Sequence, residues 1–405
     1  MSNLNRQEIS FANSPSVDAF ARARFSEPVT LFDSKQLTSK QPLYWTELAT
    51  GSGTSTHAPL TASTNMAVTT SAGSVIRQTR QYINYQPGKS QVIIATAVMG
   101  TRVSGITKRV GYFDGYNGLF FEDNGTNLGV VIRSSVSGSP VDTRVAQDSW
   151  NIDPMDGTGP SGITVDVSKG QIFAIDFEWL GLGRVRWYMF IGGTPYLVHE
   201  SLHANNVTNV YMSSPNLPVR YEIVNAAGAA AGSTMQHICS TVFSEGGFNP
   251  RGLLFTAYTD VASAISAIPR PILSIRKKAI TSNFRGTSLN VVRINLACTT
   301  NDDIRWRLFY RPTITGGTAA SWTDVNTESG MQFDVARTGT IATGSGAILA
   351  SGFFSDTVSE TVTFNTNIGL GYELSSGVPD ELVLTASNSV GSANVLSSID
   401  WIEYG

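Results

Sequence analysis

The chain has 405 residues, of which only 15% are charged, and its formal net charge is −3. This length can bury the cores of two or three domains, and a surface poor in charge but rich in Gly, Ser, Thr and Asn is typical of β-sheet proteins. Because no long basic run and no apolar stretch near ~20 residues occurs, we expect neither nucleic-acid binding nor membrane insertion.

Residues 1–40 are polar with scattered apolar anchors, and Pro15 and Pro28 interrupt any long helix. Such a segment cannot form a core alone, so it should lie on its own domain or on a neighbour. The sequence therefore predicts an extended N-terminal docking arm. Its predicted contact residues are Phe20, Arg22, Arg24, Phe25, Leu31 and Phe32. The first residues lack the charged and apolar regions of a signal peptide, which predicts synthesis in a cytoplasm without Sec-type export.

Residues 41–250 consist of short apolar runs separated by turns rich in Gly, Asn and Pro. Residues 92–98 form a continuous apolar run, whereas residues 171–179 alternate between apolar and charged positions. Many short strands at near-regular spacing are typical of antiparallel sandwiches and jelly rolls. We therefore predict one β-sandwich domain over residues 41–250.

The Gly-rich segment at residues 246–252 is the clearest domain boundary. Strand-like runs follow it, for example at residues 289–296 and 304–310, and the chain ends on an alternating strand at 398–404. These runs predict a second β-sandwich over residues 251–405. Residues 259–268 are ambiguous, because their pattern also fits a helix.

His199-Glu200-Ser201-Leu202-His203 spells H-E-x-x-H, the zinc-protease motif. The motif requires a helix, where residues four apart share one face, whereas on a strand the two histidines would be roughly 13 Å apart. Gly192-Gly193 is a hairpin signal, and Pro195 with Val198 disfavours a helix. We therefore predict a strand here and retain a zinc metalloprotease acting through His199, Glu200 and His203 only as the least favoured alternative.

Other motif matches have simpler interpretations. Residues 157–162 match G-x-G-x-x-G, but a strand-like run follows them, so they predict a loop rather than a dinucleotide site. Asp153, Asp156 and Asp166 lack EF-hand spacing, which leaves only an irregular calcium loop open. Asp176 and Glu178 share one strand face, and we interpret them as solvent-facing rather than as a glycosidase pair. We predict no catalytic residue, no cofactor and no metal.

Two further residue pairs leave alternatives open. Cys239 and Cys298 lie in apolar runs, which favours buried free thiols, although a single bridge between them remains open. Tyr112 and Tyr116 flank a turn, where exposed rings could stack on a sugar, although packing within the hairpin is the simpler interpretation.

Several segments resemble one family of proteins. Residues 16–34, SVDAFARARFSEPVTLFDS, resemble the "DAFGRLRVS-P-TLFDS" opening of virion structural proteins from tailed bacteriophages. The resemblance covers about residues 15–276, and Ala21 departs from it, because the family usually has Gly there. The other segments that carry it are residues 80–90 (RQYINYQPGKS), 108–114 (KRVGYFD), 150–153 (WNID), 156–163 (DGTGPSGI), 177–186 (FEWLGLGRVR) and 211–223 (YMSSPNLPVRYEI).

This resemblance implies a non-enzymatic virion protein that is made in the host cytoplasm and joins other virion proteins. The expected position is an outer appendage (tail, fibre or baseplate) or a capsid-associated site, reached through the arm and the β-domain edges. A homo-oligomer is expected, and a trimer is one plausible arrangement. The alternative from a different functional class is a carbohydrate-binding β-sandwich module that contacts host surface glycan.

Overall fold

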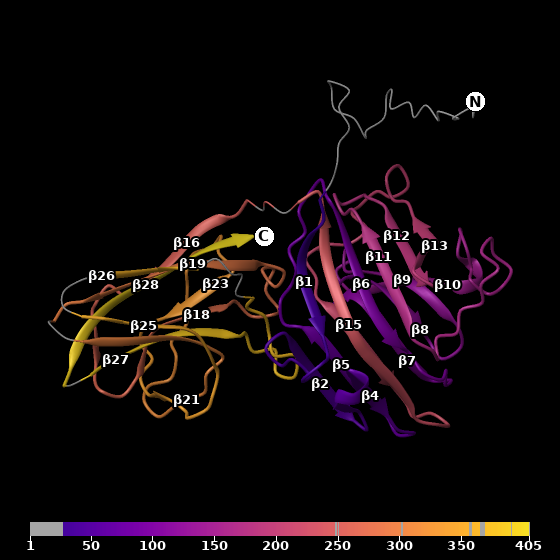
Figure 1. Ribbon diagram of the computed structural model, residues 1–405. Helices are drawn as coiled ribbons and strands as arrows, with labels where there is room; N and C mark the ends of the chain where they lie inside the picture. The colour runs from indigo at the N-terminus through magenta and orange to yellow at the C-terminus, as the bar shows by residue number, and fades with distance from the viewer. Residues whose placement is uncertain are drawn as a thin grey trace, which may run out of the picture.

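The computed structural model describes residues 27–247, 249, 251–300, 303–355, 359–364, 369–389 and 391–404. Regular structure among them is strand, apart from two short 3-10 helices, η1 (Pro59–Thr61) and η2 (Gln147–Ser149). The strands form two antiparallel β-sandwiches that lie side by side (Figure 1). The all-β fold class predicted from the sequence is therefore confirmed. In this part of the chain, no helix has the length and apolar character to cross a membrane.

The first sandwich consists of an eight-stranded and a seven-stranded sheet. In spatial order the eight-stranded sheet contains β13 (Thr194–Ser201), β12 (Val185–Ile191), β11 (Gln171–Phe177), β6 (Ser90–Val98), β15 (Ser233–Glu245), β4 (Ser63–Val68) and β3 (Thr54–Ala58), with β1 (Val29–Lys35) paired to β15. The seven-stranded sheet contains β10 (Val141–Ala146), β9 (Leu128–Ser134), β8 (Gly118–Asp123), β7 (Ile106–Phe113), β14 (Val219–Asn225), β5 (Gly73–Thr79) and β2 (Trp45–Gly51).

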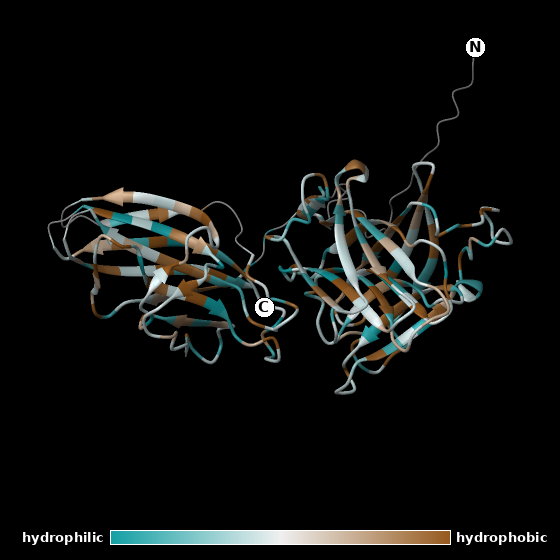
Figure 2. Cartoon of the chain, turned by 90° about the horizontal axis from the view of Figure 1, so that it is seen from below, coloured by the Kyte–Doolittle hydropathy of each residue, from teal (hydrophilic) through white to brown (hydrophobic). Residues whose placement is uncertain are grey.

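The core of this sandwich lies between its two sheets. Side chains alternate between the two faces of a strand, and one face of each strand is turned to the core. Phe173 on β11 and Trp187 on β12 are both buried in this core. Phe121 comes from β8 in the opposite sheet, with ring centroids 4.9 Å from Phe173 and 5.5 Å from Trp187. Apolar and polar residues alternate along many strands of both sandwiches (Figure 2). This alternation is the signal from which the strands were predicted.

The described part of the predicted arm belongs to the first sandwich. β1 pairs with residues 239–244 of β15, beyond residues 233–237, where β4 pairs with the same strand. Phe32 is buried against Trp45, with ring centroids 6.0 Å apart, and Leu31 is partly buried beside the same core. The sandwich therefore begins at residue 29 rather than 41, because the edge of β15 takes a partner strand past the end of β4. The other predicted arm residues, Phe20, Arg22, Arg24 and Phe25, lie outside the described residues.

The second sandwich consists of a five-stranded and a six-stranded sheet, and β16 begins just after the Gly-rich segment predicted as a boundary. The five-stranded sheet contains β16 (Leu253–Tyr258), β28 (Ala393–Tyr404), β19 (Ser288–Cys298) and β26 (Ser359–Thr363), with β17 (Ser263–Ile265) paired to β28. The six-stranded sheet contains β22 (Thr323–Asp324), β23 (Met331–Asp334), β18 (Arg270–Lys277), β27 (Glu381–Asn388), β20 (Ile304–Tyr310) and β25 (Ala347–Phe354), and a small separate sheet pairs β21 (Ile314–Thr315) with β24 (Thr340–Ile341).

The ambiguous stretch at residues 259–268 contains no helix. It contains the short strand β17, which pairs with residues 393–395 of β28. The helical alternative is therefore wrong. β28 is twelve residues long and extends beyond its pairing with β16, so the remaining part of the same edge can pair with β17.

The two sandwiches contact each other through a segment that precedes β27. Glu373 accepts a hydrogen bond from Thr46 Oγ1 on β2 at 2.7 Å, and the backbone N–H of Leu374 donates to the same Thr46 oxygen at 2.9 Å. The rings of Tyr82 and Tyr372 meet edge to face with centroids 6.3 Å apart. The second sandwich is therefore held to the first by specific side chains as well as by the linker.

Candidate functional site

The H-E-x-x-H segment is a strand over most of its length, as predicted. β13 includes His199 and ends at Ser201, and His203 lies just past its end. His199 Nδ1 accepts a hydrogen bond from the backbone N–H of Asn151 at 3.2 Å. The ring of His203 stacks on Tyr211, with centroids 4.2 Å apart, and its Nδ1 lies 2.6 Å from the carbonyl oxygen of Gly183. The two rings therefore have separate partners.

The electrostatic environment of both histidines favours the neutral ring. Burial lowers the pKa of His199 and of His203 below the ordinary histidine value. Among the described residues, no cluster of three or more His, Cys, Asp or Glu side chains could hold a metal ion. The geometry of a zinc protease, which needs His199 and His203 on one metal, is thus not formed here.

The aspartates of the loop at residues 153–166 organise the loop itself. Asp153 accepts hydrogen bonds from the backbone N–H groups of Met155 at 2.9 Å and Ser161 at 3.0 Å. Asp156 accepts from the N–H and the hydroxyl of Thr158, and Asp166 makes the same two contacts with Ser168. Each carboxylate therefore caps its own turn rather than converging on a shared ion.

Asp176, from the pair weighed for glycosidase chemistry, and the two tyrosines weighed as sugar-stacking rings have other partners, whereas Glu178 is exposed. Asp176 on β11 pairs with Arg186 and accepts a hydrogen bond from Ser90. Tyr112 is fully buried, and its hydroxyl donates to the carbonyl oxygen of Ile83 at 2.8 Å. The guanidinium of Arg285 from the second sandwich lies over the ring of Tyr116, 4.2 Å from its centroid. The stacking alternative at Tyr112 and Tyr116 is therefore not supported.

The cysteines are both free thiols. Cys239 lies on β15 of the first sandwich and Cys298 on β19 of the second, where it is buried. The open alternative of a bridge between them is not formed in this structure. The favoured prediction of buried free thiols holds for Cys298, whereas Cys239 is a free thiol that is only partly buried.

The outer face of the seven-stranded sheet carries a grid of paired charges. Arg109 on β7 lies opposite Glu122 on β8 and Glu222 on β14 and bonds to both carboxylates. Arg144 adds a 2.9 Å contact to Glu122, and Arg220 adds a 2.6 Å contact to Glu222. Next to them lies a small hydrophobic cluster of Phe113, Phe120 and Val131. The guanidinium groups of Arg109, Arg133 and Arg220 pack over its two phenylalanine rings.

This grid does not provide an acid for glycoside cleavage. Burial acts to raise the pKa of Glu222, but the charges of Arg220 and Arg109 outweigh it and lower the pKa below its ordinary value. A general acid needs the opposite shift, toward a protonated carboxyl near neutral pH. Because each carboxylate of the grid already has two arginine partners, the outer face is best explained as a stabilising ionic layer.

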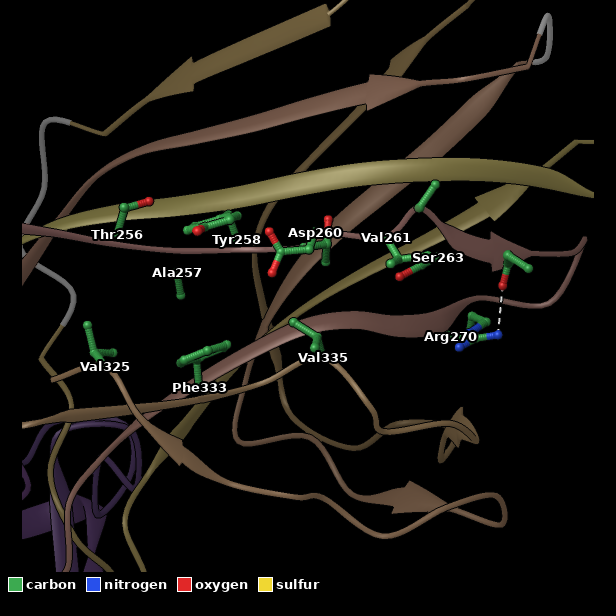
Figure 3. A pocket seen from close by; sticks show the side chains of 13 residues that line it. Thr256, Ala257, Tyr258, Asp260, Val261, Ser263, Arg270, Val325, Phe333 and Val335 are labelled. Carbon is green, nitrogen blue, oxygen red and sulfur yellow. Dashed lines mark hydrogen bonds between the residues drawn. The ribbon is translucent and has the colours of Figure 1, made fainter.

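A groove on the second sandwich has polar groups that are not paired with an opposite charge. It has a volume of about 610 Å³ and lies at the open side of the sandwich, between residues 256–264 and the β22–β23 region. In Figure 3, Tyr258 and Asp260 lie on one wall, and Val325, Phe333 and Val335 lie on the facing wall. The groove therefore joins two edge regions that are about 70 residues apart in the sequence, which is why sequence periodicity alone did not identify it.

Three side chains give the groove its chemistry. The ring of Tyr258 is 54% exposed, and no described residue donates a hydrogen bond to the carboxylate of Asp260. Arg270 Nη1 donates to the carbonyl oxygen of Ala264 at 2.7 Å, whereas its Nε–H is buried without an acceptor. An exposed tyrosine and a carboxylate without a hydrogen-bond donor thus line one concave surface together with Arg270, whose buried Nε–H has no acceptor.

Two hydroxyl groups that line the groove already have hydrogen-bond partners within the sandwich. Thr256 Oγ1 donates to Asp400 at 2.7 Å, and Thr259 Oγ1 donates to the carbonyl oxygen of Ser397. For Tyr258 and Asp260 the sequence signal is weak, because a Tyr and an Asp at the end of a strand are common in loops as well as in binding sites.

No family model matches the chain. No curated protein matches it either. Among solved structures, the CBM2 module of the evolved Dit of Lactobacillus casei BL23 phage J-1 is 8% identical with a TM-score of 0.37, over 56% of this chain and 100% of that one. A legume lectin-like domain from Entamoeba histolytica is 7% identical with a TM-score of 0.32, over 53% of this chain and 97% of that one.

A glycoside hydrolase family protein from Mycobacterium thermorestibile is 12% identical with a TM-score of 0.35, over 53% of this chain and 100% of that one. Likeness at these identities and TM-scores transfers no residue and no activity to this chain, so its function is argued from its own side chains.

Proposed function

We propose that this chain is a non-enzymatic glycan-binding protein, and that the groove on its second sandwich holds a neutral sugar. The observation that carries the proposal is that the exposed side chain of Tyr258, the carboxylate of Asp260 and the guanidinium of Arg270 line one groove, and that no described residue donates a hydrogen bond to Asp260. Ligand sites are concave and largely apolar, with a few well-placed polar groups that fix the orientation of the ligand.

Sugars match this set of groups. The C–H face of a pyranose packs on an aromatic ring, while neighbouring hydroxyls donate to a carboxylate and accept from a guanidinium. The groove holds one negative charge, on Asp260, and one positive charge, on Arg270, so its balance of charge favours a neutral glycan. No cleft among the described residues pairs a raised-pKa carboxyl with a second carboxylate, so binding without cleavage fits better than hydrolysis.

Binding to an array of neutral and acidic oligosaccharides tests this proposal. We expect neutral glycans to bind and Tyr258→Ala and Asp260→Asn each to weaken binding at least about tenfold, since each removes a contact worth more than ~1.4 kcal/mol. Tyr44→Ala is a matched control, because Tyr44 is 55% exposed on the first sandwich, away from the groove. Binding that survives both groove variants, or turnover of the bound glycan, would overturn the proposal.

A second proposal concerns the setting in which the chain works. We infer from the resemblance at residues 15–276 that it is a component of a tailed-phage particle, either an outer appendage or a capsid-associated protein. The two proposals are compatible, because a protein on the outside of a particle could also bind a host surface glycan.

A truncation tests the role of the arm. Removal of residues 1–26 leaves β1 in place on β15, whereas removal of residues 1–40 would also expose that strand edge. We expect the chain without residues 1–26 to fold and to bind glycan but not to join particles. Incorporation of this truncated chain at the normal copy number would contradict an assembly role for the arm.

A further inference from the structure

Several edge strands among the described residues are protected against pairing with other chains. Unpaired edges invite strand addition, and proteins block it with charges, prolines or short strands. Four of the edge strands, β2, β10, β13 and β26, follow this rule. Each contains at least one charged residue: Glu47 in β2, Asp142 and Arg144 in β10, Glu200 in β13 and Glu360 in β26.

β25 at the end of the six-stranded sheet does not follow this rule, and neither does β16 (LLFTAY) at the end of the five-stranded sheet. The eight residues of β25, AILASGFF, include no charge and no proline. On one side it pairs with β20, and no described strand pairs with its other side. Phe353 is 75% exposed and Ile348 is 54% exposed. An uncharged strand with a free edge and exposed apolar side chains is the form that strand pairing between chains requires.

We propose that β25 pairs with β25 of a second copy of this chain, as antiparallel strands about a two-fold axis. In such an isologous contact each copy contributes the same residues. Because β25 has no charged residue, its pairing with itself places no like charges opposite each other. The six-stranded sheet would then continue through the interface into the sheet of the second copy.

The charges beside β25 are compatible with a second copy. Arg305 and Arg307 on β20 are exposed and pair in register with Phe353 and Ser351. Across two β25 strands the arginines of the two copies would be about three strand spacings apart, roughly 14 Å, which exceeds the Debye length of ~8 Å at physiological salt. A foreign basic strand would instead bring its charges directly beside them.

The contact that β25 can make with a second copy is small, and its size limits the strength of the pairing. Leu349 is an extra residue between the register pairs of Ala350 and Ile348, so regular pairing is available over residues 350–354. An aromatic side chain such as Phe353 buries roughly 150–250 Å² when fully covered, and a stable interface needs about 800 Å² from each partner. Pairing through β25 is therefore weaker than a permanent dimer and becomes important where several copies are held close together.

Sedimentation equilibrium over a range up to about 300 µM tests the proposal. We expect the weight-average mass of the full chain to rise above the monomer mass of 43.4 kDa toward that of a dimer. Phe353→Lys and Ser351→Lys should each weaken association at least about tenfold, because each places a charge on the paired strand. Leu60→Lys is the matched control, since Leu60 is fully exposed on η1 and should have no effect.

Three results would overturn the proposal. The first is a wild-type chain that stays monomeric over the whole range. The second is association that both β25 variants leave unchanged. The third is association lost in Tyr258→Lys but kept in Phe353→Lys, which would assign the contact to the uncharged edge strand β16. Thermal unfolding of each variant distinguishes loss of pairing from loss of folding, and glycan binding is a separate readout.

Discussion

Arg80 on the first sandwich and Asp380 on the second form a buried ion pair, with Nη1 and Oδ1 3.0 Å apart. The same carboxylate accepts hydrogen bonds from Tyr310 Oη at 2.8 Å and from the backbone N–H of Gly371 at 3.1 Å, and Arg311 lies 2.8 Å away. A buried carboxylate is stable only when its oxygens are satisfied, and one of these partners comes from the other domain. The buried ion pair between Arg80 and Asp380 therefore couples the two sandwiches, because separating them would remove a partner from each buried charge.

Asp380→Ala should destabilise the protein by about 3–5 kcal/mol, because it leaves Arg80 buried without one of its two carboxylate partners. Calorimetry should show the loss and, if coupling depends on this pair, a separation of the unfolding transitions of the two sandwiches. Lys169→Ala, which removes an exposed ion pair with Asp166, is the control and should change stability by less than ~1 kcal/mol. Equal effects of the two variants would contradict the coupling.

Lys277 should make stability depend on pH. The lysine is buried at the junction, and its Nζ lies 5.3 Å from the ring centroid of Tyr82 and 4.9 Å from that of Tyr372. Its Nζ donates to the carbonyl oxygen of Arg285 at 2.8 Å. Burial lowers the pKa of Lys277 to about 7 from 10.5, although the charges of Asp380 and Glu403 oppose the shift.

Between these two pKa values the unfolded chain binds more protons at this residue than the folded one. The contribution of Lys277 to the free energy of unfolding should therefore rise as pH increases from about 7 to about 10.5, and it should be flat below pH 7. This contribution is measured by urea unfolding of wild type and Lys277→Met at several pH values. The difference in the free energy of unfolding between the two proteins isolates Lys277, because Lys108, whose pKa is also lowered, is present in both. A difference that does not change with pH would show that the lysine is solvated.

Arg109→Ala should be among the more damaging changes on the first sandwich. It removes one arginine partner from both Glu222 and Glu122, which are buried, and the expected loss is about 3–5 kcal/mol by chemical denaturation. Arg184→Ala breaks a half-exposed pair with Glu200 and should cost less than ~1 kcal/mol. Arg109→Lys keeps the positive charge but loses the guanidinium that contacts both glutamates at once, so we expect an intermediate loss of stability.

Zinc analysis should agree with the strand geometry of the H-E-x-x-H segment. The purified chain should contain far less than one zinc per molecule, and His199→Ala should not change that content, because His199 and His203 serve separate partners. Stoichiometric zinc that is lost in His199→Ala would contradict this geometry.

Local patterns predicted most of the strands. The alternation at residues 171–179 corresponds to β11, and Gly192-Gly193 corresponds to the hairpin between β12 and β13. These predictions hold because side-chain alternation and turn chemistry depend on residues close together in sequence. Residues 259–268 were ambiguous, because a short apolar run fits either period until its partner strand is known.

The sequence by itself thus determined the strand period, the two-sandwich fold and the exclusion of a helical zinc motif. The tertiary structure decided which distant residues meet. It placed β1 on β15, Arg80 on Asp380, and Tyr258 across a groove from Phe333. Partner choice between strands depends on contacts made over the whole chain, which no local period encodes.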